Sequence, residues 1–85
     1  MYFRASFIEQ NGEQQYGYDY LVEADTLVAA RAKTRLFLRD WYADFDGIVD
    51  GDMEFMGGAI TVRKASVVET TKEAFTESMV SHFTI

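Results

Sequence analysis

The strongest chemical signal in this sequence is a concentration of carboxylates between positions 40 and 54. Six acidic residues fall within these fifteen positions, and no lysine or arginine lies among them. Carboxylates spaced on a small rigid scaffold can imitate the phosphates of a nucleic acid and occupy a basic groove on another protein. The apolar residues Phe45, Ile48, Met53 and Met56 are interspersed, as in interfaces where apolar anchors lie inside a charged rim. The predicted partner-binding residues are Asp40, Asp44, Phe45, Asp46, Asp50, Asp52 and Glu54.

The same segment also suggests calcium, because hard cations prefer several carboxylate oxygens on one short loop. The EF-hand spacing is not matched. A loop that began at Asp44 would put Ile48 where an acid or amide is required and Val49 where a glycine is required. A cation site of another kind and a simply solvated acidic loop stay open as alternatives, and no metal-binding residue is predicted.

Catalytic groups are scarce. His82 is the only histidine, and Ser78 and Ser81 lie near it in sequence without any loop that would supply an oxyanion hole. The absence of cysteine excludes thiolate nucleophiles, disulfides and cysteine-bound metals. The acidic loop offers no environment that would raise one carboxyl pKa above another. We therefore expect no catalytic residue, no cofactor and no enzymatic activity.

A basic ridge is the second charged feature. Arg31, Arg35 and Arg39 recur every four residues in a predicted helix, with Lys33 alongside. This ridge is a possible secondary surface and favours nucleic-acid binding as one alternative. The net charge of −6, from eight basic and fourteen acidic residues, has the wrong sign for general attraction to phosphate backbones. A basic protein partner is therefore predicted rather than direct nucleic-acid contact.

The N-terminal elements that lead to these residues form a predicted hairpin. Residues 2–9 and 13–24 alternate apolar and polar side chains, which is typical of half-buried strands. Asn11-Gly12 between them favours a type I′ turn. The register that follows pairs Phe3 with Tyr20, Ala5 with Tyr18, Phe7 with Tyr16 and Arg4 with Asp19.

A helix is predicted over residues 26–42, with Asp25 as its N-cap and apolar residues at helical spacing. Residues 43–51, rich in aspartate and glycine, are predicted to be a loop. A second hairpin follows, with strands at 52–55 and 59–68 around Gly57-Gly58. Its register pairs Phe55 with Ile60, Met53 with Val62 and Asp52 with Arg63. Lys64 falls on the inward phase, which suggests a bulge there.

The C-terminal part is predicted as a second helix that starts at a capping box, Thr70 to Glu73, with Phe75, Met79 and Phe83 at intervals of four. The alternative for residues 79–85 is a strand, because Val80, Phe83 and Ile85 favour extended structure. The sequence does not decide between the two.

The fold class predicted from these elements is α+β, a single domain over residues 1–85 with the order ββαββα. Eighty-five residues, 48% of them hydrophobic, suffice for one core. The sheet is antiparallel and the main helix packs on one of its faces. The predicted core residues are Phe3, Phe7, Tyr18, Tyr20, Phe55, Ile60 and Val62, facing Leu27, Ala30, Phe37, Leu38 and Trp41.

In size, acidity and lack of catalytic groups, the chain resembles small accessory proteins of phages and plasmids, including inhibitors of host defence nucleases. The resemblance is one of type and rests on no motif. It implies a non-enzymatic module that presents an acidic surface to a basic, nucleic-acid-handling partner. The alternative from another class is a homodimer joined through the outer sheet face at Tyr2, Ile8, Leu21 and Val67. A cytoplasmic location without a membrane span is expected, since no signal-peptide pattern or long apolar run is present.

Overall fold

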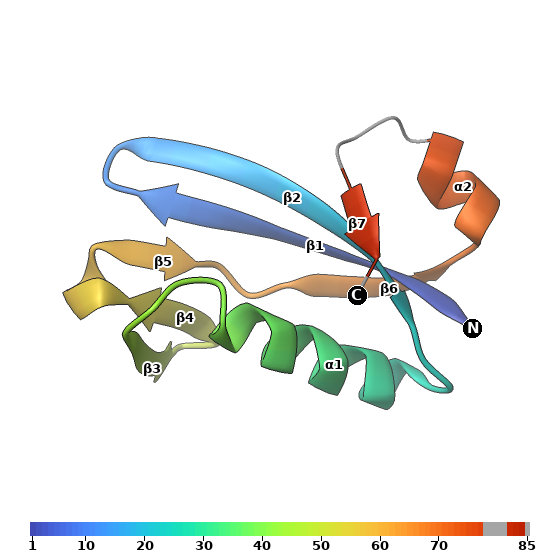
Figure 1. The fold of residues 1–85 in the computed structure, drawn as a ribbon, viewed down its shortest axis with the longest axis horizontal. Helices are drawn as coiled ribbons and strands as arrows, with labels where there is room; N and C mark the ends of the chain where they lie inside the picture. Colours follow the sequence, from blue (N-terminus) through green and yellow to red (C-terminus); the bar gives the residue numbers. More distant parts are fainter. Residues whose placement is uncertain (78–81, 85) are drawn as a thin grey trace.

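The computed structural model describes residues 1–77 and 82–84 and shows a mixed α+β domain (Figure 1). Its elements are β1 (Tyr2–Asn11), β2 (Gln14–Glu23), α1 (Leu27–Arg39), β3 (Phe45–Val49), β4 (Asp52–Phe55), the single 3₁₀ turn η1 (Met56–Gly58), β5 (Ile60–Val62), β6 (Ser66–Thr70), α2 (Lys72–Glu77) and β7 (His82–Thr84). The sheet order is β3-β4-β5-β1-β2-β7, and β6 also pairs with β1. Only the β2–β7 pair is parallel among the described strands.

The predicted α+β class with an antiparallel sheet is confirmed, but the order ββαββα is incomplete. A strand, β3, stands where a loop was predicted, and β7 follows α2. No helix among the described residues is long and apolar enough to cross a membrane.

The first hairpin is present, with a register two residues away from the prediction. Its loop residues are Gly12 and Glu13, so that Phe7 faces Tyr18 and Tyr16 faces Glu9. Gly12 has φ +62° and Glu13 does not have a positive φ, which is the pattern of a type II′ turn rather than type I′. A slip of two residues keeps every side chain on its predicted face, which is why alternation alone did not reveal the error.

The predicted pair of Arg4 with Asp19 is present, although the register differs from the predicted one. Asp19 lies opposite Ser6, and Arg4 reaches it diagonally. The Arg4 Nη2 atom lies 3.1 Å from Asp19 Oδ2, and Nε donates to Oδ1 at the same distance. The Ser6 hydroxyl also donates to Asp19. This bidentate pair fixes the outer faces of β1 and β2 together.

Strands β5 and β6 lie end to end, and both pair with β1. The predicted bulge separates the two strands. Glu9 faces Val62 and Ser6 faces Ser66. Between these pairs β1 has two residues, 7 and 8, whereas the other strand has three, 63 to 65. One extra residue is the definition of a β-bulge. The Arg63 amide still donates to the Ile8 carbonyl at 2.8 Å, so the two strands stay attached across the bulge.

Helix α1 is shorter than predicted at both ends. Its N-cap is Thr26 rather than Asp25, because Thr26 Oγ1 accepts from the Ala29 amide at 3.1 Å. The helix ends at Arg39, so Trp41 lies beyond it. The last turn tightens through bonds from the Asp40 and Trp41 amides to carbonyls three residues back. Predicted contact residue Leu27 is exposed instead.

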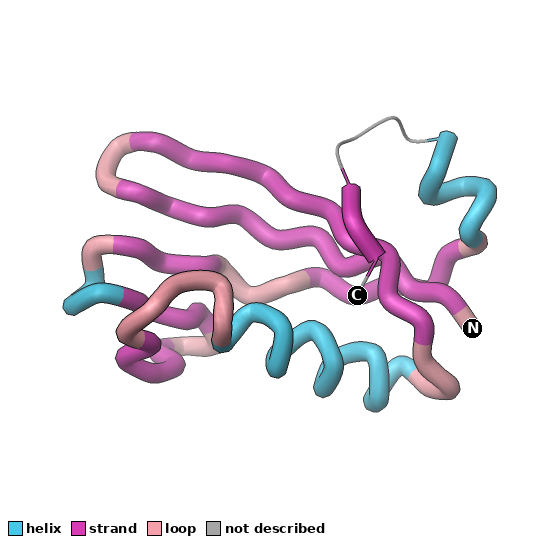
Figure 2. The backbone as a smooth tube through the Cα atoms, in the orientation of Figure 1, coloured by secondary structure: helices cyan, strands magenta, loops and turns pink. Residues whose placement is uncertain are grey.

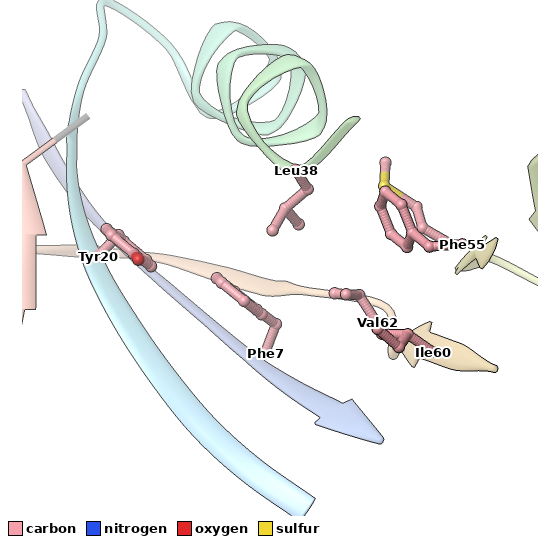
Figure 3. Packing of buried hydrophobic residues seen from close by; sticks show 7 residues of the cluster. Phe7, Tyr20, Leu38, Phe55, Ile60 and Val62 are labelled. Carbon is pink, nitrogen blue, oxygen red and sulfur yellow. The ribbon is translucent and has the colours of Figure 1, made fainter. Parts of the chain in front are cut away.

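The core lies between α1 and one face of the sheet (Figure 3). One cluster, on the side of β4 and β5, contains Phe7, Tyr20, Leu38, Met53, Phe55, Ile60 and Val62. The other, on the side of β6, contains Phe3, Ala5, Val22, Ala30 and Val67. The Trp41 ring meets Phe7 edge-on, with centroids 5.2 Å apart. Apart from Leu27, the predicted core residues all belong to these clusters or pack against them.

The predicted loop over residues 43–51 is largely the strand β3, which pairs with β4. Its hairpin turn is Asp50-Gly51, with Val49 opposite Asp52. Both turn residues have positive φ, +53° and +87°, as a type I′ turn requires. Asp-Gly is one of the preferred dipeptides for a type I′ turn. The turn was not predicted, because the aspartate and glycine content of the whole segment was interpreted as a loop.

At the C-terminal end, helix α2 is capped by Thr71, whose Oγ1 accepts from the Ala74 amide at 3.0 Å, rather than by Thr70. Residues 82–84 form β7 beside β2, so the strand alternative is confirmed for them, including Phe83. The predicted helical position Met79 and residues 80, 81 and 85 lie outside the described residues. The register of the second hairpin is confirmed for Phe55 with Ile60 and Met53 with Val62.

Candidate functional site

The acidic corner, which comprises Asp40, Asp44, Phe45, Asp46, Asp50, Asp52 and Glu54, lies where the chain leaves α1 and enters the β3–β4 hairpin. Figure 2 shows this connecting loop leading from the helix into the short strands at one end of the sheet. The predicted site residues therefore belong to one structural unit. Phe45 and Asp46, predicted to lie in a loop, lie in β3, which pairs with β4, whereas Asp40 and Asp44 lie in the connection between α1 and β3.

Two carboxylates of the acidic corner hold backbone amides. Asp46 Oδ2 accepts from the Gly57 amide at 2.6 Å, which ties β3 to η1. Asp52 Oδ1 accepts from the Lys64 amide at 2.7 Å, which ties β4 to the bulge, and Asp52 does not form the predicted pair with Arg63. Charge-assisted bonds of this kind are stronger than neutral ones. These two residues therefore shape the corner before any partner arrives.

The other carboxylates of the acidic corner face water. Asp40, Asp44 and Asp50 are exposed, and Glu54 is half-buried. Asp44 and Asp50 have positive φ, and the Asp44 carbonyl accepts from the Met56 amide at 2.9 Å. The backbone of the corner is therefore fixed at several points, while three of its side-chain charges remain open to a partner.

Phe45 is held inside the corner rather than displayed. Its ring centroid lies 5.5 Å from that of Phe55, and the guanidinium carbon of Arg39 lies 5.3 Å from the Phe45 centroid. A cation over an aromatic face at this distance is attracted by the ring quadrupole. One member of the predicted basic ridge thus joins the acidic corner instead of standing apart from it.

The apolar side chains that the corner does display are Ile48, Val49 and Met56, each about half exposed, at 52%, 53% and 49%. Ile48 and Met56 were anticipated as anchors in the sequence. Met53 was anticipated too, but it faces the core. Val49, at the end of β3, was not anticipated.

Metal ligands do not come together here. Among the described residues, no three histidine, cysteine or acidic side chains are placed to hold a metal ion. Asp46 and Asp52 each accept a backbone amide with one carboxylate oxygen. His82 lies in β7, where its backbone pairs beside Asp19, and Ser78 and Ser81 lie outside the described residues.

Glu9 is the residue that sequence analysis missed. It points to the core side of β1 with an exposed fraction of only 2%. Its Oε1 accepts from Trp41 Nε1 at 2.8 Å, and its Oε2 accepts from the Tyr42 hydroxyl at 3.0 Å. The signal was available, because Glu9 continues the inward phase of Phe3, Ala5 and Phe7. A carboxylate in that phase needs donors from another element.

The contact with Glu9 fixes the start of the acidic corner. Trp41 and Tyr42 follow Asp40, the C-cap of α1, and lead toward β3. The hydrogen bond that Tyr42 donates to Glu9 raises the pKa of the Tyr42 phenol, with burial as a smaller cause. A phenol that keeps its proton continues to donate, so the connection between α1 and β3 stays attached to β1 at neutral pH.

The basic ridge divides between two places. Arg31 and Arg35 are exposed on α1, whereas Arg39 covers Phe45. Arg31 and Arg35 line a groove that also contains Arg63 and Lys64. No local sequence pattern associates the helix with Arg63 and Lys64, because the bulge that brings them there depends on long-range pairing with β1.

The outer sheet face differs from the apolar surface predicted for a homodimer. Val67 is opposite Ala5 and packs in the inner cluster, so it is not on that face. Leu21 is on it but is only 4% exposed. Near it, the guanidinium carbon of Arg4 lies 5.8 Å from the centroid of the buried Phe75 ring of α2. Of the four predicted residues, Ile8 is exposed and Tyr2 is half-buried.

The geometry of the acidic corner is thus a braced hairpin with open charges and displayed apolar side chains. Three carboxylates and three apolar side chains of this unit are open to contact with another molecule. Comparison with protein-family models, with curated proteins and with solved structures finds no match for this chain.

Proposed function

We propose that this protein is a non-enzymatic binding module whose acidic corner docks on a basic surface of a protein partner. The observation that carries the proposal is the display of Ile48, Val49 and Met56, each about half exposed, among carboxylates. Exposed apolar side chains inside a charged rim give an interface its binding energy, while the charges steer the encounter. A carboxylate cluster that served only solubility would not need them.

Rigidity supports the proposal. The anchors on Asp46, Asp52 and Glu9 fix the corner before binding. A surface that is ordered in advance loses less conformational entropy on docking than a loop that must be ordered by its partner.

The partner we favour is one that handles nucleic acid, because its basic groove would accept carboxylates in place of phosphates. The module would then act as an inhibitor that mimics nucleic acid, in the cytoplasm where such partners work. Competition between the protein and the nucleic acid for that groove is the expected consequence.

The test uses two variants that each remove two negative charges. In one, Asp44→Asn and Asp50→Asn change exposed carboxylates of the corner. In the matched control, Glu13→Gln and Asp25→Asn change exposed carboxylates elsewhere. Tagged wild type captures a basic partner from its native cell extract, and the affinity for the purified partner is then measured at several salt concentrations. We expect about tenfold weaker binding for the corner variant, since each lost charge pair at a rim weakens association.

Salt provides the second criterion, because screening should shrink the difference between wild type and the corner variant. A third variant, Val49→Ser, should weaken binding at every salt concentration, since it removes apolar contact rather than charge. Equal losses of affinity in the corner and control variants would show that binding depends only on net charge, which would contradict the proposal.

A further inference from the structure

A second surface has the opposite character. A groove of about 750 Å³ runs between α1 and the bulged strand formed by β5 and β6, and the β3–β4 hairpin contributes one wall. Four cationic residues line it: Arg31, Arg35, Arg63 and Lys64. They make up half of the eight basic residues of the chain, and no acidic residue is among the described residues that line the groove. The groove is therefore a local region of positive charge in a protein whose net charge is −6.

The cations of this basic groove have no carboxylate partners among the described residues. Arg63 Nη2 lies 3.5 Å from the amide oxygen of Gln10, and no ion pair involves any of the four. Like charges gathered without counter-charges repel one another, so an anionic ligand would relieve that repulsion. The charge of the groove therefore favours an acidic occupant.

The floor of the basic groove is apolar. Leu38 and Val62, both buried in the core, lie at its base, and the half-exposed Ile48 stands on its wall. A ligand that was only an anion, such as inorganic phosphate, would leave this floor unused. The combination favours an occupant with carboxylates and at least one apolar side chain.

The edge of β6 lies along the same groove. Ser66, Val67 and Val68 all line it, although alternate residues of a strand point to opposite faces. Residues of both faces can line one groove only if the edge of the strand is turned toward it. β6 pairs with β1 on one side, and no described strand pairs with its other side. Figure 1 shows α1 running along β6, which gives the groove its second wall.

We propose that the basic groove binds an extended acidic peptide segment of another protein, which adds as a strand to the edge of β6. The peptide backbone would pair with β6, its carboxylates would meet the four cations, and an apolar side chain would enter toward Leu38 and Val62. Main-chain pairing with specificity from alternate side chains is an established mode of peptide recognition. This inference does not rest on the acidic corner: the two surfaces share Ile48, but the groove takes a partner of opposite charge and is tested by different variants.

The test measures binding of short fluorescein-labelled peptides by anisotropy at low salt. One alternates glutamate with leucine, one alternates glutamate with serine, and one alternates lysine with leucine. We expect saturable binding of the first, clearly weaker binding of the second and none of the third. Failure of the glutamate–leucine peptide to bind, or equal binding of the glutamate–serine peptide, would overturn the proposal.

Variants on one helix locate the site. Arg35→Glu reverses a charge inside the groove, and Lys33→Glu makes the same change in net charge on an exposed residue of α1 outside it. We expect about tenfold weaker binding for Arg35→Glu, as for a lost charge pair at an interface, and less than about twofold for Lys33→Glu. Equal effects of the two variants would show attraction to net charge alone and contradict a built site.

Amide chemical shifts in NMR spectra should change mainly in β6 and the facing side of α1 when the peptide binds. Shifts confined to other strands would contradict addition at β6. Two other occupants are separated in the same experiment. Displacement of the peptide by a single-stranded oligonucleotide would overturn the peptide assignment. Amide shifts of the groove that change with protein concentration in the free protein would also overturn it, because a second copy would then occupy the groove.

Discussion

At the scale of single residues, hydrophobic patterning places Glu9 on the inward face of β1 but does not show which groups it binds there. Sequence patterns place a side chain on a face, but they do not say which donors will meet a polar group there. The donors come from Trp41 and Tyr42, more than thirty positions later in the chain. The same reason explains why the carboxylates of the acidic corner were found in the sequence, while the anchoring roles of Asp46 and Asp52 were not.

The prediction at this scale concerns Glu9→Ala. The substitution leaves the Trp41 indole and the Tyr42 hydroxyl without their acceptor, and hydrogen bonds to a charged group contribute about 1.5 to 3 kcal/mol each. We expect a loss of about 2 to 4 kcal/mol in the free energy of unfolding, which is a large part of the stability of a small domain. Urea denaturation followed by the fluorescence of the single tryptophan measures it.

Two controls accompany Glu9→Ala. Glu9→Gln keeps an acceptor oxygen, so its loss should be smaller. Glu13→Ala removes an exposed carboxylate and should change little. If Glu9→Ala unfolds at the same urea concentration as the wild type, Glu9 does not hold the segment after α1.

At the scale of elements, the sequence predicted the existence of most strands better than their connections. The first hairpin and the pairing of β4 with β5 were found, because alternation and glycine turns are local signals. The choice of turn was wrong at Asn11-Gly12 and overlooked at Asp50-Gly51, since the acidic composition of the second suggested a loop. The bulge was found from the phase of Lys64, but its consequence, the basic groove, needed the pairing with β1.

The prediction at the element scale concerns Gly51→Ala. Gly51 has φ +87°, where an L side chain costs about 1 to 2 kcal/mol. The added Cβ would also lie 3.3 Å from Lys64 Cδ, the flexible part of a side chain that can move. We expect a loss of about 1 to 2 kcal/mol and a lower midpoint of thermal unfolding.

Gly17→Ala is the matched control for the turn. Gly17 lies in β2 without a positive φ, and a Cβ there would meet nothing within 4 Å. Its replacement should leave the midpoint unchanged or raise it slightly, because alanine reduces the entropy of the unfolded chain. If the two variants melt together, the β3–β4 hairpin does not depend on the left-handed conformation of its turn.

At the scale of the whole molecule, the charges are separated rather than mixed. The β3–β4 hairpin carries Asp50 of the acidic corner, and the adjacent Gly51 lines the basic groove. The connection from α1 brings Asp40 and Asp44 to the same end of the sheet. Composition gave the net charge correctly, but only the folded arrangement shows two surfaces of opposite sign on one small scaffold.

This arrangement predicts that the acidic corner lowers stability while it serves binding. Asp40, Asp44 and Asp50 are exposed, and none of them has an ion-pair partner among the described residues. Excess negative charge on the compact folded state repels itself, and the repulsion is relieved when the chain unfolds. The variant with Asp44→Asn and Asp50→Asn should therefore melt at a higher temperature than the wild type at low ionic strength.

Salt should raise the melting midpoint of the wild type more than that of the variant. The two midpoints should approach each other near physiological ionic strength, where the Debye length is about 8 Å. The control with Glu13→Gln and Asp25→Asn removes the same charge from scattered exposed positions and should gain less. Scanning calorimetry at several salt concentrations measures all three proteins, and a corner variant that melts below the wild type at low salt would show that these carboxylates support the fold instead of straining it.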